Sequence, residues 1–288
     1  MLNTEALRAE SRYKDAVRVL AVASGKGGVG KTNMAVNLAL ALARRGESVL
    51  LMDADLALAN LDVVLGIRPR HDLYQVITGE RNINDIIIDG PHGIGIVPAS
   101  SGVRRMAELS VAEHAGLIRA FDEVERHVDT LLIDTAAGLS ESVVSFCRAA
   151  NEVLVVVCDE PASLTDAYAL IKVLGQEHGV RRFQVIGNMV QDAAHGRQLY
   201  GKLSRVAEHY LADVALGYLG AVPFDERLKQ AVRQQRALMQ QSPYSASGLA
   251  FQQLAERITA LPRQTAPGYF EFFANRCERG APAMGRTA

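Results

Sequence analysis

The sequence has no tryptophan and only three cysteines, Cys147, Cys158 and Cys277, which form no Cys-x-x-Cys pair. A disulfide framework or a cysteine-bound metal cluster is therefore not expected, and the first two cysteines lie in apolar stretches typical of a core. No apolar run is long enough to span a bilayer, and the polar residues 1–16 lack the apolar segment of a secretory signal. Together these absences predict a cytoplasmic protein.

Net charge and aromatic content are also low. The net charge is −1 over 288 residues, so the chain as a whole has no electrostatic preference for nucleic acid or an acidic membrane. Any such contact would need a local patch. Hydrophobic residues make up 49% of the chain, which is enough for the core of one large α/β domain or two small ones.

The stretch that organises the chain is Gly25-Lys26-Gly27-Gly28-Val29-Gly30-Lys31-Thr32. An apolar run over 17–23 precedes it and an alanine- and leucine-rich run over 33–45 follows it, which is the strand, loop and helix context of a P-loop. The glycine-rich backbone and the start of the helix can bind phosphate oxygens. Lys31 can reach the β- and γ-phosphates, and the Thr32 hydroxyl can hold Mg²⁺. The stretch fits the Walker A pattern at every fixed position and predicts a nucleoside triphosphate site.

Strand-like runs alternate with helical patterns along the rest of the chain. The strand-like runs are apolar throughout, as expected when both faces of a sheet are covered. We predict strands at 17–23, 48–52, 94–98, 130–134, 152–158, 183–188 and 217–222, and helices at 33–45, 104–127, 140–150, 162–177, 194–212, 225–240 and 246–260. The pattern predicts an α/β fold with a doubly wound, mostly parallel sheet flanked by helices on both faces. Residues 81–88 fit either a short strand or a short helix.

The predicted organisation is an N-terminal arm over 1–16, one P-loop ATPase domain over 17–262 and a C-terminal tail over 263–288. The tail contains an unusual aromatic segment, in which Tyr269, Phe270, Phe273 and Cys277 would share one face of a helix. Two interpretations remain open: an interfacial or partner-docking helix, or a tail that packs on its own domain.

Acidic residues follow two of the predicted strands. Besides the glycine loop, a P-loop NTPase requires a strand that ends in an acidic residue, and the run Leu131–Asp134 supplies it. Asp134 is expected near Mg²⁺, through a bound water. Residues 135–138 would then sense the γ-phosphate. The segment 53–62 carries three aspartates and an asparagine, and it is too polar to be buried without a function.

The second lysine of the loop, Lys26, makes Lys-Gly-Gly-x-Gly-Lys-Thr resemble the deviant Walker A box of the MinD/ParA class of dimeric ATPases. The resemblance implies an ATP-dependent homodimer in which Lys26 contacts the nucleotide of the partner subunit. The segment 53–62 matches the D-x-D-x-x-x-x-N-x-D switch element of MinD-like proteins. By that resemblance Asp55 orients or deprotonates the attacking water, Asp53 supports the magnesium site, and Asn60 contacts the phosphates or the partner.

The adenine pocket is expected at later strand ends. Asn188 ends one predicted strand with an amide suited to the adenine edge, and the loop that begins at 221–225 can close over the base. The resemblance assigns Asn188, Pro223 and Asp225 to base binding. The sequence lacks the Asn/Thr-Lys-x-Asp guanine motif, which favours ATP over GTP.

Several stretches resemble more specifically the FlhG/FleN (YlxH) regulators of flagellar number, and these are Asp134–Gly138, Ser142–Phe146, Val155–Pro161 and Thr165–Lys172. The resemblance implies slow ATP hydrolysis, action on a signal-recognition-particle-type flagellar GTPase (FlhF), and restraint of a flagellar transcription activator (FleQ).

Two features depart from that group. Its N-terminal activator motif keeps only Leu7-Arg8 here, so stimulation of the GTPase through the arm is not implied. Some relatives carry a C-terminal membrane-targeting helix. Residues 268–279 are the only candidate for it here, and they are not strongly amphipathic. Lipid binding through this segment would bring the protein to the membrane at the cell pole.

Other functions fit the sequence less well. A ParA-like DNA-partitioning role could use Arg227, Lys229, Arg233 and Arg236 as a phosphate-binding stripe, but a near-neutral chain favours a solvated helix face, so nucleic acid is not an expected partner. A MinD-like division-site regulator needs a stronger membrane helix than this tail. A metallocluster carrier needs paired cysteines, and a metabolic kinase needs a second substrate lobe.

Overall fold

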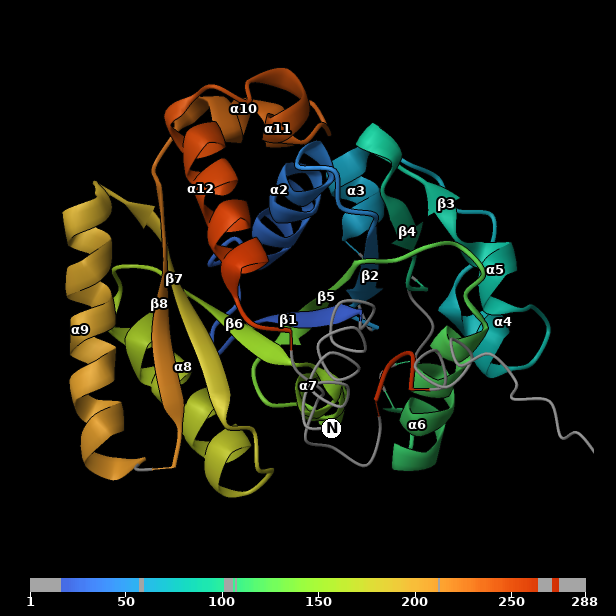
Figure 1. Ribbon diagram of the computed structural model, residues 1–288, viewed down its shortest axis with the longest axis horizontal. Helices are drawn as coiled ribbons and strands as arrows, with labels where there is room; N and C mark the ends of the chain where they lie inside the picture. The colour runs from blue at the N-terminus through green and yellow to red at the C-terminus, as the bar shows by residue number, and fades with distance from the viewer. Residues whose placement is uncertain are drawn as a thin grey trace, which may run out of the picture.

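A computed structural model describes residues 17–56, 60–100, 106, 108–211, 213–263 and 271–274 (Figure 1). Within these residues an eight-stranded sheet has the order β3-β4-β2-β5-β1-β6-β7-β8. The strands are β1 (Arg18–Ser24), β2 (Val49–Ala54), β3 (Ile88–Asp89), β4 (Gly95–Val97), β5 (Thr130–Ala137), β6 (Glu152–Val157), β7 (Arg182–Val190) and β8 (Ala215–Pro223). The pairs are parallel except for β3 with β4. The predicted doubly wound, mostly parallel sheet is confirmed.

Helices cover both faces of this sheet (Figure 1). They are α2 (Lys31–Arg44), α3 (Leu61–Leu65), α4 (Leu73–Ile77), α5 (Ile83–Ile86), α6 (Val111–Ala120), α7 (Glu141–Ala149), α8 (Pro161–Gln176), α9 (Ala193–Tyr210), α10 (Glu226–Arg233), α11 (Leu238–Gln241) and α12 (Ala246–Ala260), with 3-10 turns η1 (Pro91–Gly93) and η3 (Phe121–Glu123). One core lies between the sheet and α6, α7, α8 and α9, and the other between the sheet and α2, α3, α11 and α12. Alternate residues of β1 enter opposite cores, because successive strand side chains point to opposite faces. This explains the continuous apolar strands.

Two predicted helices are shorter than expected. The helix predicted over 104–127 is α6 and η3, and α6 begins after Ser110, whose hydroxyl accepts the backbone N–H of Glu113 in a capping box. The helix predicted over 225–240 is two helices, α10 and α11, separated at Gln235, which has a left-handed φ of 53°. The break lets Leu238 and Met239 become fully buried against α2. Residues 81–88 contain both α5 and the start of β3.

The described part of the tail packs on the domain. Phe272 and Phe273 are buried, with their ring centroids 4.9 and 5.9 Å from that of Phe121, and Phe272 also stacks on Phe146. For these two residues the contacts support the interpretation that the tail packs on its own domain. The interfacial interpretation is wrong for Phe273, while its other predicted aromatic and cysteine positions lie outside the described residues. No helix in the described part of the chain is long and apolar enough to cross a bilayer.

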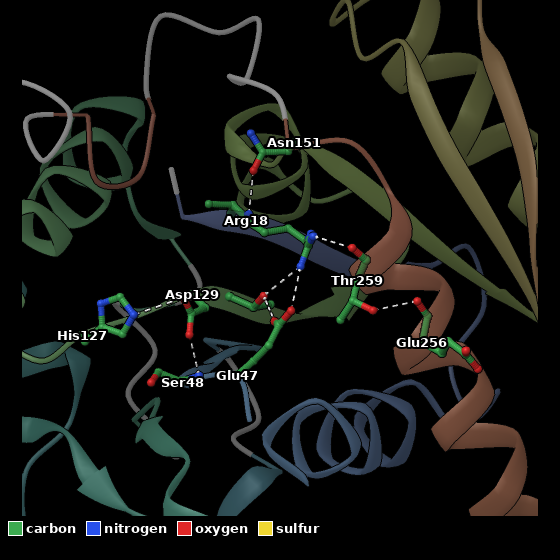
Figure 2. A network of polar contacts seen from close by, with 10 residues as sticks. Arg18, Glu47, Ser48, His127, Asp129, Asn151, Glu256 and Thr259 are labelled. Carbon is green, nitrogen blue, oxygen red and sulfur yellow. Dashed lines mark hydrogen bonds and ion pairs between the residues drawn. The ribbon is translucent and has the colours of Figure 1, made fainter. Parts of the chain in front are cut away.

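A buried polar network joins the amino ends of β1 and β5 (Figure 2). The Arg18 guanidinium, on a residue that is only 5% exposed, donates to Glu47 at 3.1 Å and to the Thr259 carbonyl near the end of α12 at 3.4 Å. Burial lowers the pKa of Arg18, and the neighbouring Glu47 opposes that change. Asn151 accepts the Val19 backbone N–H at 2.6 Å. The network fixes the end of the sheet opposite the glycine loop.

Candidate nucleotide site

The glycine loop follows β1 at the carboxyl end of the sheet and leads directly into α2. Gly28 and Gly30 have left-handed φ values of 81° and 86°, which favour glycine. A Cβ on Gly25 would lie 2.2 Å from the backbone of Asp166 in α8. The loop can therefore take this path only with glycine, and it leaves its N–H groups and the amino end of α2 available for an anion.

Lys31, Thr32 and Asp134 meet at the start of α2. The Lys31 ammonium lies 3.7 Å from Asp134 Oδ1. Asp134 is completely buried, and among the described residues neither carboxylate oxygen finds a hydrogen-bond partner with ordinary geometry. Burial raises its pKa to about 6, although Lys31 and Thr32 act in the opposite direction. A buried carboxylate that lacks hydrogen bonds of ordinary geometry is costly unless a cation compensates its charge, so the arrangement beside Lys31 fits a magnesium ion.

Asp53 lies beside Asp134 in the sheet, since the two residues are paired in the register of β2 and β5. Its Oδ1 accepts the backbone N–H of Asp55 at 3.1 Å, and its Oδ2 accepts those of Asn60 and Leu61 at 3.0 and 3.1 Å. Burial and the charge of Asp134 raise the pKa of Asp53 to about 7. The contacts show Asp53 holding both ends of the switch segment 55–61. The sequence predicted only that Asp53 supports the magnesium site; its contacts with the switch segment were not predicted.

Asp55 and Asn60 belong to that switch segment. Asp55 is half-buried directly after β2, and Asn60 is exposed at the start of α3. Asp53 joins the backbones of both residues to the carboxyl end of the sheet, near the glycine loop. The structure thus brings Asp53 and Asp55 to the same edge of the sheet as Lys31 and Asp134, as the strand-end pattern predicts.

Lys26 forms an ion pair with Glu160, which follows β6 on the same chain. The hydrogen bond to Glu160 raises the pKa of Lys26. Both side chains are exposed in part, at 38% and 56%. Glu160 was not among the predicted site residues, because the sequence pattern predicts the strand before it but not the strand order that places β6 next to β1 and the glycine loop.

A cavity of about 310 Å³ adjoins the glycine loop. Its lining comes from the loop, from the ends of β7 and β8 and from α10, and it comprises Gly28, Gly30, Asn33, Asn188, Met189, Pro223, Phe224, Asp225, Leu228, Lys229, Val232 and Arg233. The three residues predicted for base binding are all among them. Phe224 lies in the loop over 221–225 that was predicted to close over the base. Lys229 was not predicted for base binding, and its ammonium lies 4.3 Å from the centroid of the Phe224 ring.

The orientation of Asn188 is set by the loop itself. Its Nδ2 donates to the Val29 carbonyl at 2.7 Å, and the side chain is buried. A carbonyl can only accept, so the Asn188 Oδ1 remains as an acceptor beside the cavity. Asp225, by contrast, uses its carboxylate to cap α10 through Arg227 N–H at 2.9 Å and to accept Ser247 N–H at 3.1 Å. Asp225 therefore shapes the cavity wall through these caps.

Comparison with known proteins identifies the family. The ParA family model, described as NUBPL iron-transfer P-loop NTPase, matches residues 15–259. The chain belongs to the ParA family. It is a MinD/ParA-class P-loop ATPase with the deviant Walker A loop described above, as predicted.

Individual ParA-family relatives are similar over almost the whole chain. The antiactivator FleN of Pseudomonas aeruginosa is 52% identical over 270 residues, which cover 93% of this chain and 96% of that protein. The flagellum site-determining protein YlxH of Helicobacter pylori is 33% identical and covers 90% of each. The septum site-determining protein MinD of Pyrococcus horikoshii, solved with Mg-ADP, has a TM-score of 0.68 at 26% identity, with 84% of this chain and 96% of that chain covered. Nucleotide and Mg²⁺ binding thus occur within the family.

The raised pKa of Asp134 predicts a pH-dependent stability without nucleotide. A carboxyl whose folded pKa is about 6 favours folding while it is neutral, and this contribution is lost as the pH rises through 6. Asp134→Asn should therefore stabilise the nucleotide-free protein by about 3 kcal/mol at pH 8 and by about half as much at pH 5, because pH 5 lies between the unfolded and the folded pKa of this carboxyl. Urea unfolding at both pH values measures this.

The control for this measurement is Asp89→Asn, because the Asp89 side chain is 90% exposed. It should change stability little at either pH. A lower stability of Asp134→Asn at pH 8 would show that the carboxylate is not an uncompensated buried charge.

Proposed function

We propose that this ParA-family ATPase is an ATP-dependent, dimerising switch that regulates flagellar number or placement. The similarity to FleN, at 52% identity over 93% of the chain, carries the proposal. The switch would act in the cytoplasm on a flagellar GTPase, on a flagellar transcription activator, or on both. Slow hydrolysis would serve as a timer between a monomeric and a dimeric state.

Each residue at the phosphate end of the site has a proposed role. Residues 25–32 would bind the phosphates through backbone N–H groups and the Lys31 ammonium. Thr32 and Asp134 would hold Mg²⁺, which when bound neutralises charge on the β- and γ-phosphate oxygens. Asp53 would support that ion indirectly and hold the switch segment, and Asp55 would orient or deprotonate the attacking water.

The base end of the site favours adenine. The Asn188 Oδ1 would accept a hydrogen bond from the 6-amino group of adenine, whereas guanine presents an acceptor at that position. Pro223 and Asp225 would shape the loop over the base. ATP is therefore the proposed nucleotide.

The proposed role of Lys26 is in dimerisation. In the cross-subunit arrangement of the class, Lys26 would exchange its contact with Glu160 for the phosphates of the partner subunit. Exposed ion pairs are weak, so this exchange has a small energetic cost. Asn60, exposed at the start of α3, would lie at the phosphates or the same interface.

The decisive experiment captures partners from a lysate of the source cells with two baits. Asp55→Ala with ATP represents the ATP-bound form, and Lys31→Ala represents the nucleotide-free form. We expect the flagellar GTPase or the flagellar activator, identified by mass spectrometry, with one bait and not with the other.

A Lys26→Ala bait separates nucleotide binding from dimerisation, because it should bind ATP without the ATP-dependent doubling of mass. Equal recovery of both flagellar proteins with every bait would contradict a nucleotide-dependent switch. Recovery of bulk DNA with the ATP-bound bait, released by modest salt, would favour a DNA-partitioning protein that uses the exposed cations of α10.

A further inference from the structure

His195 lies in the first turn of α9 and contacts two separate segments. The Gln191 backbone N–H donates to His195 Nδ1 at 3.3 Å, and His195 Nε2 lies 2.9 Å from Asp159 Oδ2. Because Nδ1 accepts, the ring proton is on Nε2, which donates to the Asp159 carboxylate. The neutral imidazole thus satisfies both contacts. The Lys202 ammonium lies 3.8 Å from the other Asp159 oxygen, Oδ1.

The turn that His195 holds on one side belongs to the base cavity. Asn188 and Met189 line that cavity, and Gln191 follows them by two residues. Met189 has a left-handed φ of 54°, a conformation that costs energy for a side chain of this kind and persists only when its surroundings enforce it. The Phe224 N–H bond to the Val190 carbonyl, at 2.9 Å, fixes the turn from the β8 side.

The segment that His195 holds on the other side leads to the glycine loop. Asp159 is followed by Glu160, which pairs with Lys26. The side chain of His195 therefore bridges two neighbouring strand ends, one with the base-reading amide and one with the partner of Lys26. The His195 side chain is 17% exposed, whereas the Asp159 side chain is 47% exposed.

We infer that His195 is a positioning residue for the nucleotide base, a role that rests on the proposed ATP-binding function. It holds the backbone turn 188–191 in the shape that presents the Asn188 Oδ1 to the cavity, and it does not itself touch the nucleotide. Asp159 keeps the ring in the tautomer that this contact requires. The base-dependent part of the ATP affinity therefore depends on His195, and the phosphate-dependent part does not.

The test compares Mg-ATP with inorganic tripolyphosphate and Mg²⁺, which has phosphates but no base. Loss of one hydrogen bond at the turn predicts that His195→Ala weakens ATP binding about fivefold, while the affinity for tripolyphosphate is unchanged. Calorimetry or competition against a fluorescent nucleotide measures both affinities. His209→Ala, at the exposed end of the same helix, is the matched control and should change neither affinity.

Two further variants separate positioning from a general loss of structure. His195→Asn keeps an acceptor near the place of Nδ1 and should retain the ATP affinity of the unchanged protein. His195→Gln keeps a donor for Asp159 but leaves the Gln191 N–H without an acceptor, so it should behave like His195→Ala.

Several outcomes would overturn the inference. They are unchanged ATP affinity in His195→Ala, an equal loss of ATP and tripolyphosphate, or failure of the Asn variant to restore binding. Failure of the proposed function is distinguishable, because the unchanged protein would then show no Mg-ATP binding that Lys31→Ala removes.

Discussion

Asp55→Ala is expected to lose most ATP hydrolysis while it keeps its affinity for ATP. Asp55 lies outside both the glycine loop and the lining of the base cavity, so the bound ground state owes little to its carboxylate. Its place at the end of β2, held through its own N–H by Asp53, suits contact with the attacking water. Positioned acid or base groups contribute about 10²- to 10⁴-fold to rate, and a loss in that range is expected here.

Phosphate release under saturating ATP measures the rate, and calorimetry measures the affinity. Asp89→Ala removes an exposed aspartate far along the chain and should hydrolyse ATP normally. Hydrolysis within threefold of the unchanged protein would remove Asp55 from the water-positioning role. A parallel loss of affinity and rate would instead show that Asp55 supports binding, since a contribution to the transition state alone leaves affinity intact.

Lys31→Ala is expected to lose nucleotide binding by about two orders of magnitude, because a charged hydrogen bond is worth about 1.5–3 kcal/mol and a second effect adds to it. The second effect acts through Asp134. The Lys31 ammonium lowers the pKa of that carboxyl, so its removal shifts Asp134 further toward the neutral form, which is a poor magnesium ligand. The phosphates and the cation thus lose affinity together.

Calorimetry with Mg-ATP and Mg-ADP at pH 8 measures this loss, and thermal melting confirms that the variant is folded. Lys172→Ala, which removes an exposed lysine from α8, is the control and should bind normally. An unchanged affinity in Lys31→Ala would mean that the phosphates bind somewhere other than the glycine loop.

Local patterns were sufficient for the architecture and for the phosphate half of the site. The strand, glycine loop and helix around Lys31 could be predicted because each step depends on residues adjacent in sequence: an apolar run, glycines with left-handed φ, and a helix start. Asp134, which ends the predicted strand 130–134 and lies in the carboxyl-terminal half of β5, followed from the same reasoning, since parallel strands bring their carboxyl ends to one edge of the sheet.

Boundaries and the tail required the tertiary structure. The helix over 225–240 reads as continuous in its local pattern, yet burial of Leu238 and Met239 against α2 outweighs the cost of a left-handed Gln235. In the same way, helical spacing grouped Phe273 with the other tail aromatics but left open whether they pack on the domain. The tertiary structure decides this for Phe273, which is buried against Phe121 and so removes apolar surface from water.

The sequence by itself therefore determined the P-loop, the sheet and the acids at its carboxyl edge, because these depend on near neighbours and on periodicity. Only the tertiary structure decided that Glu160 pairs with Lys26, that Asp53 holds the switch segment, and that His195 joins the base cavity to the loop after β6. The physical reason is common to all three. Each is a contact between chain segments whose separation in space is set by strand order and packing, and no local pattern in the sequence encodes that separation.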